Sequence, residues 1–256
     1  MDHISATVIT GNEEQHIERC LNSLEGVADE IIVVDSYSSD RTVEICRRYG
    51  CKITQRPFTG FGSQRQYAVG LVTYNFVLAI DADEVLSEDL RAELIRMKNE
   101  GLEHRVYSIK VINYFCGRPL QRSGWRPGSE FRLFNKRYAN WNMHKLGERV
   151  TFDPQLMPAP IEKGHIDHYW INSIDEFERK EQRRVTLLAR ILASSNSSIS
   201  VLTPFYYACR DFIRFHIHEA ALLDGCNGNS IALRRSKTTF RAYKIARGII
   251  KRHKNI

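Results

Sequence analysis

The chain lacks any long uninterrupted apolar run. None of its apolar segments approaches the ~20 residues that a membrane-spanning helix needs. It begins Met1-Asp2-His3 and enters an apolar segment at once, so we expect no signal peptide. The six cysteines (20, 46, 51, 116, 209 and 226) include no Cys-x-x-Cys pair, and most lie on apolar faces of expected helices. We therefore expect reduced core thiols in a cytosolic protein.

Two glycine-rich nucleotide-binding fingerprints are also missing. The turn after the first apolar segment, Gly11-Asn12-Glu13-Glu14, has no Gly-x-Gly-x-x-Gly pattern, and no Gly-x-x-x-x-Gly-Lys-Ser/Thr occurs in the chain. These absences exclude a P-loop and argue against a dinucleotide-binding Rossmann domain. Acidic residues are missing from one region, since none follows residue 230.

The first hundred residues contain a repeated alternation of expected strands and helices. Apolar segments at 4–10, 29–35, 51–54 and 76–80 are each followed by apolar residues at helical spacing. Strands that are apolar on both faces require helices on both sides of a parallel sheet. We predict an α/β fold with a Rossmann-like, mostly parallel sheet and flanking helices. A chain of 256 residues can form one such domain with a helical appendage.

Polar side chains fall where these strands are expected to end. Such sheets bind ligands at the carboxyl ends of their strands. An Asp-x-Asp alone is a weak signal, because an acid after a strand is often a helix cap, but here polar residues recur after successive strands. With acids in place of glycines, phosphates would be held through a hard divalent cation. The residues are Thr10, Asn12 and Glu14 after the first strand, Asp35 after the second, and Asp81 and Asp83 after the fourth.

Four motifs in this order resemble a known family. They are Val8-Ile-Thr-Gly-Asn-Glu-Glu14, Asp29-Glu-Ile-Ile-Val-Val-Asp-Ser36 with Asp40-Arg-Thr42, Gln64-Arg65, and Asp81-Ala-Asp-Glu84. Together they look like the family 2 glycosyltransferases of GT-A fold. The likeness is nearest to the bacterial β-glucosyltransferase branch that acts in lipopolysaccharide core biosynthesis. It is dense over about the first hundred residues and scattered beyond them.

The resemblance implies an inverting transfer of a hexose from a UDP-sugar to an acceptor hydroxyl, with Mg²⁺ or Mn²⁺ as cofactor. By analogy Asp35 would bind the uracil, and Asp81 would contact the ribose. Arg65 would approach the base or the phosphates, while Asp83 would ligate the cation on the diphosphate. The nucleoside pocket would be lined by Thr10, Asn12 and Glu14.

Inversion in a single displacement needs a general base for the acceptor's proton. In the family, an Arg-Leu-Phe strand precedes a loop with a His-Glu element whose acid is the usual base candidate. Arg132-Leu-Phe134 is present, and Glu148 aligns with that acid, although Gly147 stands where the family often has His and the nearby histidine is His144. Glu130, in the loop expected just before the strand, is the competing candidate. Either acid could instead pair with a neighbour (Arg126, Arg132, Lys145 or Arg149), and we favour Glu148 as the base.

The run His165-Ile-Asp-His-Tyr-Trp170 is a second polar cluster. His168 matches a family histidine and is a further candidate for the metal shell. A histidine that only hydrogen-bonds within the fold is an equally good interpretation. Zinc is disfavoured, because no third ligand lies at the usual spacing. The tryptophans 125, 141 and 170 could stack on sugar rings, yet a large aromatic is more often part of a core.

The last third of the chain changes character. Apolar residues at helical spacing predict one helix over about 174–192 and a second over about 205–223, with Gly225 as its stop. We therefore expect a catalytic domain over residues 1–172, with a nucleotide-sugar half (1–100) and an acceptor half (101–172). A helical region over 173–256 follows it.

The chain's positive charge is concentrated at its end. Nine Lys and Arg residues follow position 230, and the rest has 28 basic against 30 acidic side chains. Because aromatic and aliphatic residues accompany these charges, residues 231–256 could lie on anionic lipid. Such docking would suit a lipid-linked or lipopolysaccharide-type glycan acceptor and a peripheral position at the inner face of the cytoplasmic membrane. We expect no nucleic-acid partner, because no nucleic-acid-binding motif accompanies the charge.

Two other functions remain open. A sugar nucleotidyltransferase would share the fold and the metal carboxylates, but its Gly-rich basic first loop is missing, and Asn12-Glu-Glu14 would repel a triphosphate. A catalytically silent, membrane-docked subunit could bind sugar nucleotides or glycolipid. The intact Asp81, Asp83 and Glu148 argue against the silent subunit.

Overall fold

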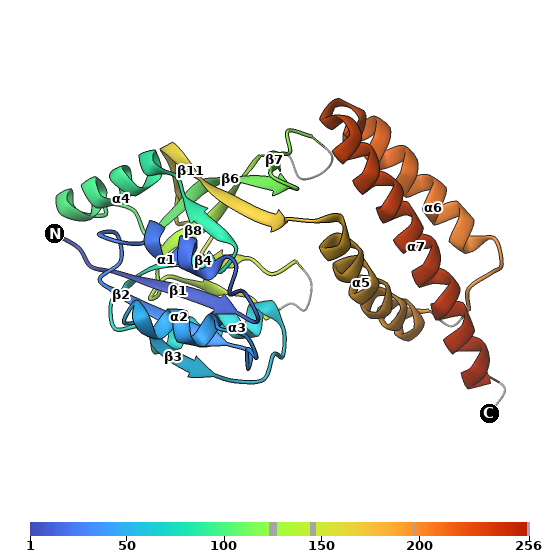
Figure 1. The fold of residues 1–256 in the computed structure, drawn as a ribbon, viewed down its shortest axis with the longest axis horizontal. Coiled ribbons are helices and arrows are strands. Elements are labelled where there is room, and N and C mark those ends of the chain that lie inside the picture. Colours follow the sequence, from blue (N-terminus) through green and yellow to red (C-terminus); the bar gives the residue numbers. More distant parts are fainter. Residues whose placement is uncertain (123–126, 144–146, 197, 255–256) are drawn as a thin grey trace. The chain divides into compact units, whose positions relative to one another are not determined.

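The computed structural model describes residues 1–122, 127–143, 147–196 and 198–254. The chain forms two compact units. The first contains Met1–Ile112 and Gly128–His168, and the second contains Asn113–Pro127 and Tyr169–Ile256. Figure 1 shows the sheet with its helices in the first unit and long helices in the second.

A mixed sheet organises the first unit, and its parallel part lies in the N-terminal half. Four consecutive strands of the order are parallel, and the strands beyond β4 join it with antiparallel pairings of β4 with β8, β8 with β6 and β11 with β5. The predicted α/β class with a Rossmann-like parallel sheet is confirmed. The strand order is β3 (Lys52–Gln55), β2 (Glu30–Asp35), β1 (Ile4–Thr10), β4 (Phe76–Asp81), β8 (Gly128–Asn135), β6 (Val106–Phe115), β11 (Ala159–Ile171) and β5 (Glu84–Leu86).

Helices cover both faces of this sheet, as its fully apolar strands require. Helices α1 (Ile17–Ser23) and α2 (Thr42–Arg48) lie over one face (Figure 1), and α4 (Glu88–Glu100) packs into the same core. Helix α3 (Phe61–Leu71) contributes to the core on the other face. Successive residues of β4 alternate between the two cores, with Leu78 in the first and Val77 in the second.

Two short antiparallel strands complete the second core. Strands β9 (Ala139–Trp141) and β10 (Val150–Phe152) pair with each other, and their residues pack with α3 and β8. The side chain of Gln66 on α3 donates a hydrogen bond of 3.2 Å to the carbonyl of Trp141. This contact fixes one end of the β9–β10 loop, which carries Glu148, against α3.

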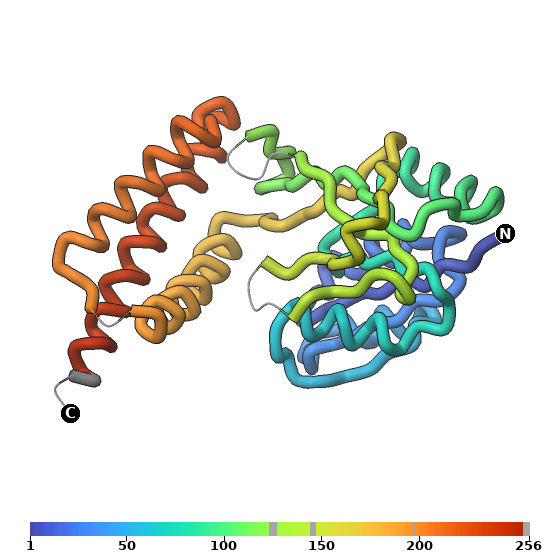
Figure 2. The backbone as a smooth tube through the Cα atoms, turned by 180° about the vertical axis from the view of Figure 1, so that it is seen from behind, coloured from blue at the N-terminus to red at the C-terminus, as the bar shows by residue number. Residues whose placement is uncertain are grey.

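The second unit is built from three helices, α5 (Ile174–Ser195), α6 (Thr203–Ile213) and α7 (Gly225–Lys254). Figure 2 follows their backbones as consecutive rods. Its core includes Phe177 of α5 and Ile231 of α7, with Phe115 and Leu120 from the segment around the short strand β7 (Arg118–Pro119). Within the described ranges, no helix combines the length and the hydropathy that crossing a membrane requires.

The prediction of one continuous helix ending at Gly225 was wrong. After α6 the chain forms a π-helical turn, η1 (Arg214–His218), and a 3-10 turn, η2 (Ala221–Asp224), separated by Ala220 in the left-handed region at φ 49°. Gly225 begins α7. A Cβ on Gly228 would lie 2.0 Å from the carbonyl oxygen of Ala221, so only glycine fits where α7 crosses this turn.

The cysteines fall into three groups by their exposure. Cys20 and Cys46 are buried, as expected for core thiols, and Cys51 and Cys116 are half-buried. Cys209 and Cys226 are exposed, so the expectation that the thiols lie in the core does not hold for these two.

Glu30 joins three segments at the end of the sheet where β1 and β2 pair. It accepts hydrogen bonds from the hydroxyl of Ser5 (2.6 Å), the ammonium of Lys52 (2.6 Å) and the backbone N–H of Thr73 (2.5 Å). Burial alone would raise the pKa of Glu30, but these donors lower it from 4.5 to about 2. The carboxylate therefore stabilises the fold in its charged form.

We predict that Glu30→Gln lowers the free energy of unfolding at pH 7 by about 2 kcal/mol. Because the pKa of Glu30 is depressed, this stabilisation is present above pH 4.5 and is lost as the pH falls towards about 2. Urea unfolding of wild type and variant at several pH values measures both effects. The exposed Glu103→Gln is the control, and equal losses from the two substitutions would contradict the role of Glu30.

Candidate active site

The ends of β1 and β2 are tied together by their loops. The side-chain carbonyl of Asn12 accepts a 2.8 Å hydrogen bond from the N–H of Ser39, and Asn12 N–H donates to the hydroxyl of Ser38 at 2.8 Å. The carboxylate of Glu14 accepts from the N–H of Arg41 at 3.1 Å. Asn12 adopts a positive φ of 61°, a conformation that asparagine tolerates better than most residues. Asn12 and Glu14 thus shape the loop that follows β2.

Asp35 is fully buried at the end of β2. Its carboxylate accepts hydrogen bonds from the N–H of Ser38 (3.0 Å), the hydroxyl of Ser38 (2.5 Å) and the side-chain amide of Gln55 (2.8 Å). These bonds occupy three of its roughly four acceptor positions. In this structure Asp35 organises the turn at 36–38.

Arg65 of α3 brings two predicted site residues together. Its guanidinium contacts both oxygens of Asp81, at 2.5 Å from Nη2 to Oδ2 and 3.2 Å from Nε to Oδ1. Its Nη1 donates to Oε1 of Glu148 at 2.7 Å. The ring of Trp141 lies 4.7 Å from the guanidinium carbon. The end of β4 and the β9–β10 loop therefore meet at one nearly buried cation.

Charge, and not exposure to water, keeps Arg65 and Asp81 ionised. Desolvation would raise the pKa of Asp81, but the positive charges of Arg65 and then Arg132 lower it. Desolvation would likewise lower the pKa of Arg65, and the charge of Asp81 raises it instead. Both groups stay charged at neutral pH, so the guanidinium and the carboxylate hold each other in place.

A second ion pair is joined to the first through Asp81. Glu84 of β5 is fully buried and contacts Nη2 of Arg132 on β8 at 2.6 Å, while its other oxygen accepts from the N–H of Asp81 at 2.8 Å. Desolvation raises the pKa of Glu84 despite the neighbouring charge of Arg132. Glu130, the competing base candidate, also contacts Arg132, at 2.9 Å. Glu130 lies within β8 and not in a loop before it, which corrects its predicted position.

Asp83 lies in the two-residue turn between β4 and β5, 3.5 Å from Nε2 of His168 on β11. His168 pairs with Glu84 in the register of β11 and β5. Burial would lower the pKa of His168, but Asp83, followed by Glu84 and Asp81, raises it to about 9. Asp83, from the turn after β4, and His168, from within β11, thus point to one place.

This pair fits a divalent cation that shares its ligands with a substrate. Within the described ranges, no three His, Cys, Asp or Glu residues are placed to hold a metal ion by themselves. Mg²⁺ is usually bound through one or two protein oxygens, with substrate phosphates and water as the other ligands. A carboxylate beside an imidazole meets that requirement once the imidazole loses its proton.

Two buried polar atoms near the ends of β1 and β2 have no hydrogen-bond partner within the part of the chain that the structure describes: Thr10 Oγ1 and Gln64 Oε1. The amide nitrogen of Gln64 donates to the hydroxyl of Ser36 at 3.1 Å. Buried polar atoms are nearly always paired, so these two are candidates for contact with a polar ligand. The Gln64-Arg65 motif predicted a role for Arg65 but none for Gln64.

The structure brings most predicted site residues to one edge of the sheet, but it does not make the tryptophans binding platforms. Trp141 is buried under Arg65, and Trp170 is half-buried and packs on Phe177 of α5 at 5.6 Å between ring centroids. Both therefore contribute to cores. Trp125, Arg126, His144 and Lys145, named as candidates or neighbours from the sequence, lie outside the described residues.

Sequence comparison identifies the class of protein. A family model for glycosyl transferase family 2 matches residues 5–152, more than half of the chain, and the chain belongs to this family. The match spans β1 to β10 and so includes all the strand ends described above except that of β11. The predicted family and its GT-A fold are confirmed.

The individual relatives share between 16% and 36% of their residues with this chain over the aligned regions. A Rickettsia typhi protein named as an uncharacterized glycosyltransferase is 36% identical over 143 residues, 55% of this chain and 49% of that protein. The chain spans about half the length of the Rickettsia relatives that it matches. The lipopolysaccharide core biosynthesis glycosyltransferase LpsC of Rhizobium meliloti is 28% identical over 192 residues, 73% of this chain and 70% of LpsC. The crystal structure of S. aureus TarS 1–349 superposes with a TM-score of 0.47 at 16% identity, covering 97% of this chain and 91% of TarS.

The buried pair of Glu84 and Arg132 gives a test of the site's construction. We predict that Arg132→Met, which leaves Glu84 without its cation, lowers the free energy of unfolding by about 3 kcal/mol or more. The double variant Glu84→Gln/Arg132→Met should lose less than Arg132→Met alone, because no uncompensated charge stays buried. Urea unfolding measures both. The exposed Arg137→Met is the control. The pairing would be contradicted if the loss of unfolding free energy in the double variant equalled the sum of the losses measured for Glu84→Gln and Arg132→Met alone.

Proposed function

We propose that the protein is an inverting glycosyltransferase that moves a hexose from a UDP-sugar to a hydroxyl of a cell-envelope glycan or glycolipid. The observation that carries this proposal is the Arg65 cluster. In a family 2 chain, it joins the Asp81 carboxylate at the end of a parallel strand to Glu148, an acid from outside the nucleotide half. A donor-binding carboxylate and a base are thereby held within reach of a single reaction centre.

The donor would bind at the carboxyl ends of β1, β2 and β4. Thr10 and Gln64 offer unpaired buried oxygens to the nucleoside, and Asn12 and Glu14 form the loop beside it. Asp35 would meet the uracil through its remaining acceptor position, and Asp81 would accept from the ribose while keeping its contact with Arg65. Arg65, whose three nitrogens each already donate to a carboxylate, would act chiefly by positioning Asp81 and Glu148.

Asp83 would hold Mg²⁺ or Mn²⁺, with His168 completing the protein's share of the shell. When bound, the cation supplies positive charge that stabilises the departing diphosphate. The chain's own contribution is to fix the Asp83 carboxylate in a tight turn and to place an imidazole against it at 3.5 Å. The turn has only two residues, because β4 ends at Asp81 and β5 begins at Glu84.

Glu148 would take the proton from the acceptor hydroxyl as its oxygen attacks the sugar. Its side chain is 18% exposed and is held by Arg65. Glu130 has a side chain that is 55% exposed and is held by Arg132. The less exposed acid beside the donor carboxylate is the better candidate, because a base acts within hydrogen-bond reach of the proton that it removes.

We extend the proposal to the acceptor and the organisation of the chain. Residues 1–172 would catalyse the reaction, with 1–100 binding the donor and 101–172 the acceptor, and 173–256 would serve a separate purpose. The likeness to LpsC, which covers 73% of this chain, supports a lipopolysaccharide-type or otherwise lipid-linked acceptor. Such an acceptor would place the enzyme at the inner face of the cytoplasmic membrane. Membership of family 2 favours sugar transfer over nucleotidyl transfer.

The test of the metal site is a panel of UDP-, GDP- and dTDP-sugars with Mn²⁺ or Mg²⁺. We expect one UDP-sugar to raise the melting temperature and to be hydrolysed slowly, both in a metal-dependent manner. Asp83→Asn should abolish the thermal shift and slow hydrolysis about 100-fold or more, because the carboxylate that holds the cation is lost. The exposed Asp89→Asn is the matched control. An active Asp83→Asn variant would refute the metal assignment, and no response to any donor would favour a silent binding subunit.

The choice of base can be made with the same assay, in which water is the acceptor. We predict that Glu148→Gln lowers the rate of donor hydrolysis about 10²–10⁴-fold while UDP affinity stays nearly constant, since the amide still accepts from Arg65 but cannot take a proton. Glu130→Gln, the matched control, should lose less than about tenfold. The opposite order would assign the base to Glu130.

A further inference from the structure

Helix α6 presents an apolar face to solvent. Leu202 is 73% exposed, Tyr206 is 66% exposed and Ile217, in the π-helical turn that continues the helix, is 69% exposed. Together with other exposed apolar residues that recur every three or four positions between them, they lie on one side of the helix. This α6 face consists of the exposed residues Leu202, Phe205, Tyr206, Cys209, Phe212, Ile213 and Ile217.

The rest of α6 packs on α7, and Phe205 at the border of the α6 face also contacts Phe240 of α7, with ring centroids 4.9 Å apart. Tyr207 stacks on Tyr243 with ring centroids 4.5 Å apart, and the carboxylate of Asp211 accepts a 2.7 Å hydrogen bond from Thr239. Helix α6 therefore exposes its larger apolar face to solvent. A helix that packs onto a hydrophobic core would bury that face instead. An exposed apolar surface of this extent marks an interaction site.

A groove of about 670 Å³ runs between the α6 face and α7. Phe212 and Ile213 line it from α6, and Lys237 and Arg241 line it from α7 together with Leu233 and Phe240. Helix α7 contains no Asp or Glu over its whole length. Apolar side chains are thus bordered by cations along one edge.

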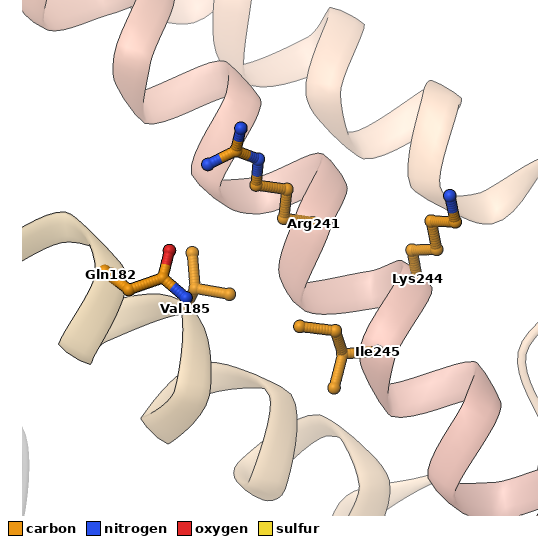
Figure 3. Close-up of a pocket in the computed structure, with 5 residues that line it drawn as sticks. All are labelled: Gln182, Val185, Arg241, Lys244 and Ile245. Atoms are coloured by element: carbon orange, nitrogen blue, oxygen red, sulfur yellow. The ribbon is translucent and has the colours of Figure 1, made fainter. Parts of the chain in front are cut away.

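Positive charge continues onto the other side of α7. A second hollow, of about 470 Å³, is lined by Arg241, Lys244 and Ile245 of α7 and by Gln182 and Val185 of α5. In Figure 3 the side chain of Lys244 points away from α5. Arg241 borders both hollows. Two acids on this side of the unit are paired with arginines: Asp211 of α6 with Arg210 at 2.7 Å, and Glu219, which follows η1, with Arg214 at 2.8 Å.

We propose that the α6 face inserts into the surface of an anionic lipid bilayer, while Lys237, Arg241 and Lys244 contact the headgroup phosphates. The apolar strip supplies burial in the acyl boundary, and each basic residue near an anionic surface adds attraction. A second copy is a poorer occupant, because a two-fold pairing through this face would bring two sets of Lys237 and Arg241 together. This inference deepens the proposed function and rests on it for its purpose, which is to bring the enzyme to a lipid-linked acceptor.

The docking surface differs from the one that the sequence suggested. The sequence predicted that residues 231–256 lie on anionic lipid. In the structure α7 packs against α5 and α6 and directs Phe240 and Tyr243 towards α6. Arg235 is buried beside Glu181 at 3.3 Å, so not every basic residue of α7 is available. The apolar part of the surface comes from α6 and the charged part from α7.

The experiment is flotation of the full chain with vesicles of phosphatidylcholine alone and mixed with phosphatidylglycerol. We expect binding to the mixed vesicles that weakens with salt. The triple variant Tyr206→Gln/Ile213→Gln/Ile217→Gln should bind at least about tenfold more weakly, because three exposed side chains no longer enter the bilayer. Leu187→Gln, an exposed apolar position on α5, is its control and should bind as wild type does.

A second pair of variants tests the charges. Lys237→Gln/Arg241→Gln should bind mixed vesicles about tenfold or more weakly, whereas Arg183→Gln/Arg190→Gln removes the same charge from exposed positions of α5 and should bind nearly as wild type. Equal losses from the two variants would overturn the assignment of Lys237 and Arg241. Circular dichroism and melting temperatures establish that each variant is folded.

Three results would overturn the docking proposal. These are no flotation of the wild type, unchanged flotation of the triple variant, or a wild-type dimer that the triple variant converts to monomers without any vesicle binding. Flotation needs neither donor nor metal. A chain that floats as expected but hydrolyses no UDP-sugar would therefore contradict the proposed reaction and leave the docking surface intact.

Discussion

The candidate site depends on the guanidinium of Arg65. Helix α3 delivers it from one face of the sheet, while Asp81 comes from the end of β4 and Glu148 from the loop between β9 and β10. Two carboxylates close together repel each other unless a cation lies between them, and here the cation is itself shielded by the ring of Trp141. The bond from Gln66 to the same tryptophan fixes the loop. One side chain thus links the end of β4 to the β9–β10 loop of the first unit.

The parallel half of the fold could be predicted because its signals are local. The strands are short and mostly apolar, the helices begin near polar residues, and the side chains that matter follow a strand directly. Helix α4, for example, begins after Ser87, whose hydroxyl accepts from the N–H of Leu90. The carboxyl ends of parallel strands share one edge, so Thr10, Asp35 and Asp81 meet there by topology alone.

What could not be predicted depends on pairings between distant segments or on residues without a local preference. Glu84 and Arg132 are 48 positions apart and meet only because β5 and β8 belong to the same sheet. Glu130 was expected in a loop, since a Gly and Pro-rich stretch hid the start of β8. The break after α6 occurs at Ala220, a good helix former that takes a left-handed conformation, so the pattern pointed to Gly225. The basic residues of α7 could be counted from the sequence, but which of them are exposed follows from its packing between two helices.

The sheet ends at β3, which has only four residues and one edge with which no other described strand pairs. Unpaired edges are where a strand of another chain can add itself and start aggregation, and short length and lysine both discourage such addition. Lys52 at the start of β3 keeps a charged side chain there that is 63% exposed, while its ammonium contacts Glu30 of β2. Lys52 thus neutralises a carboxylate within the sheet and also guards the outermost strand. Resistance to aggregation and the cohesion of the N-terminal strands therefore depend on the same side chain.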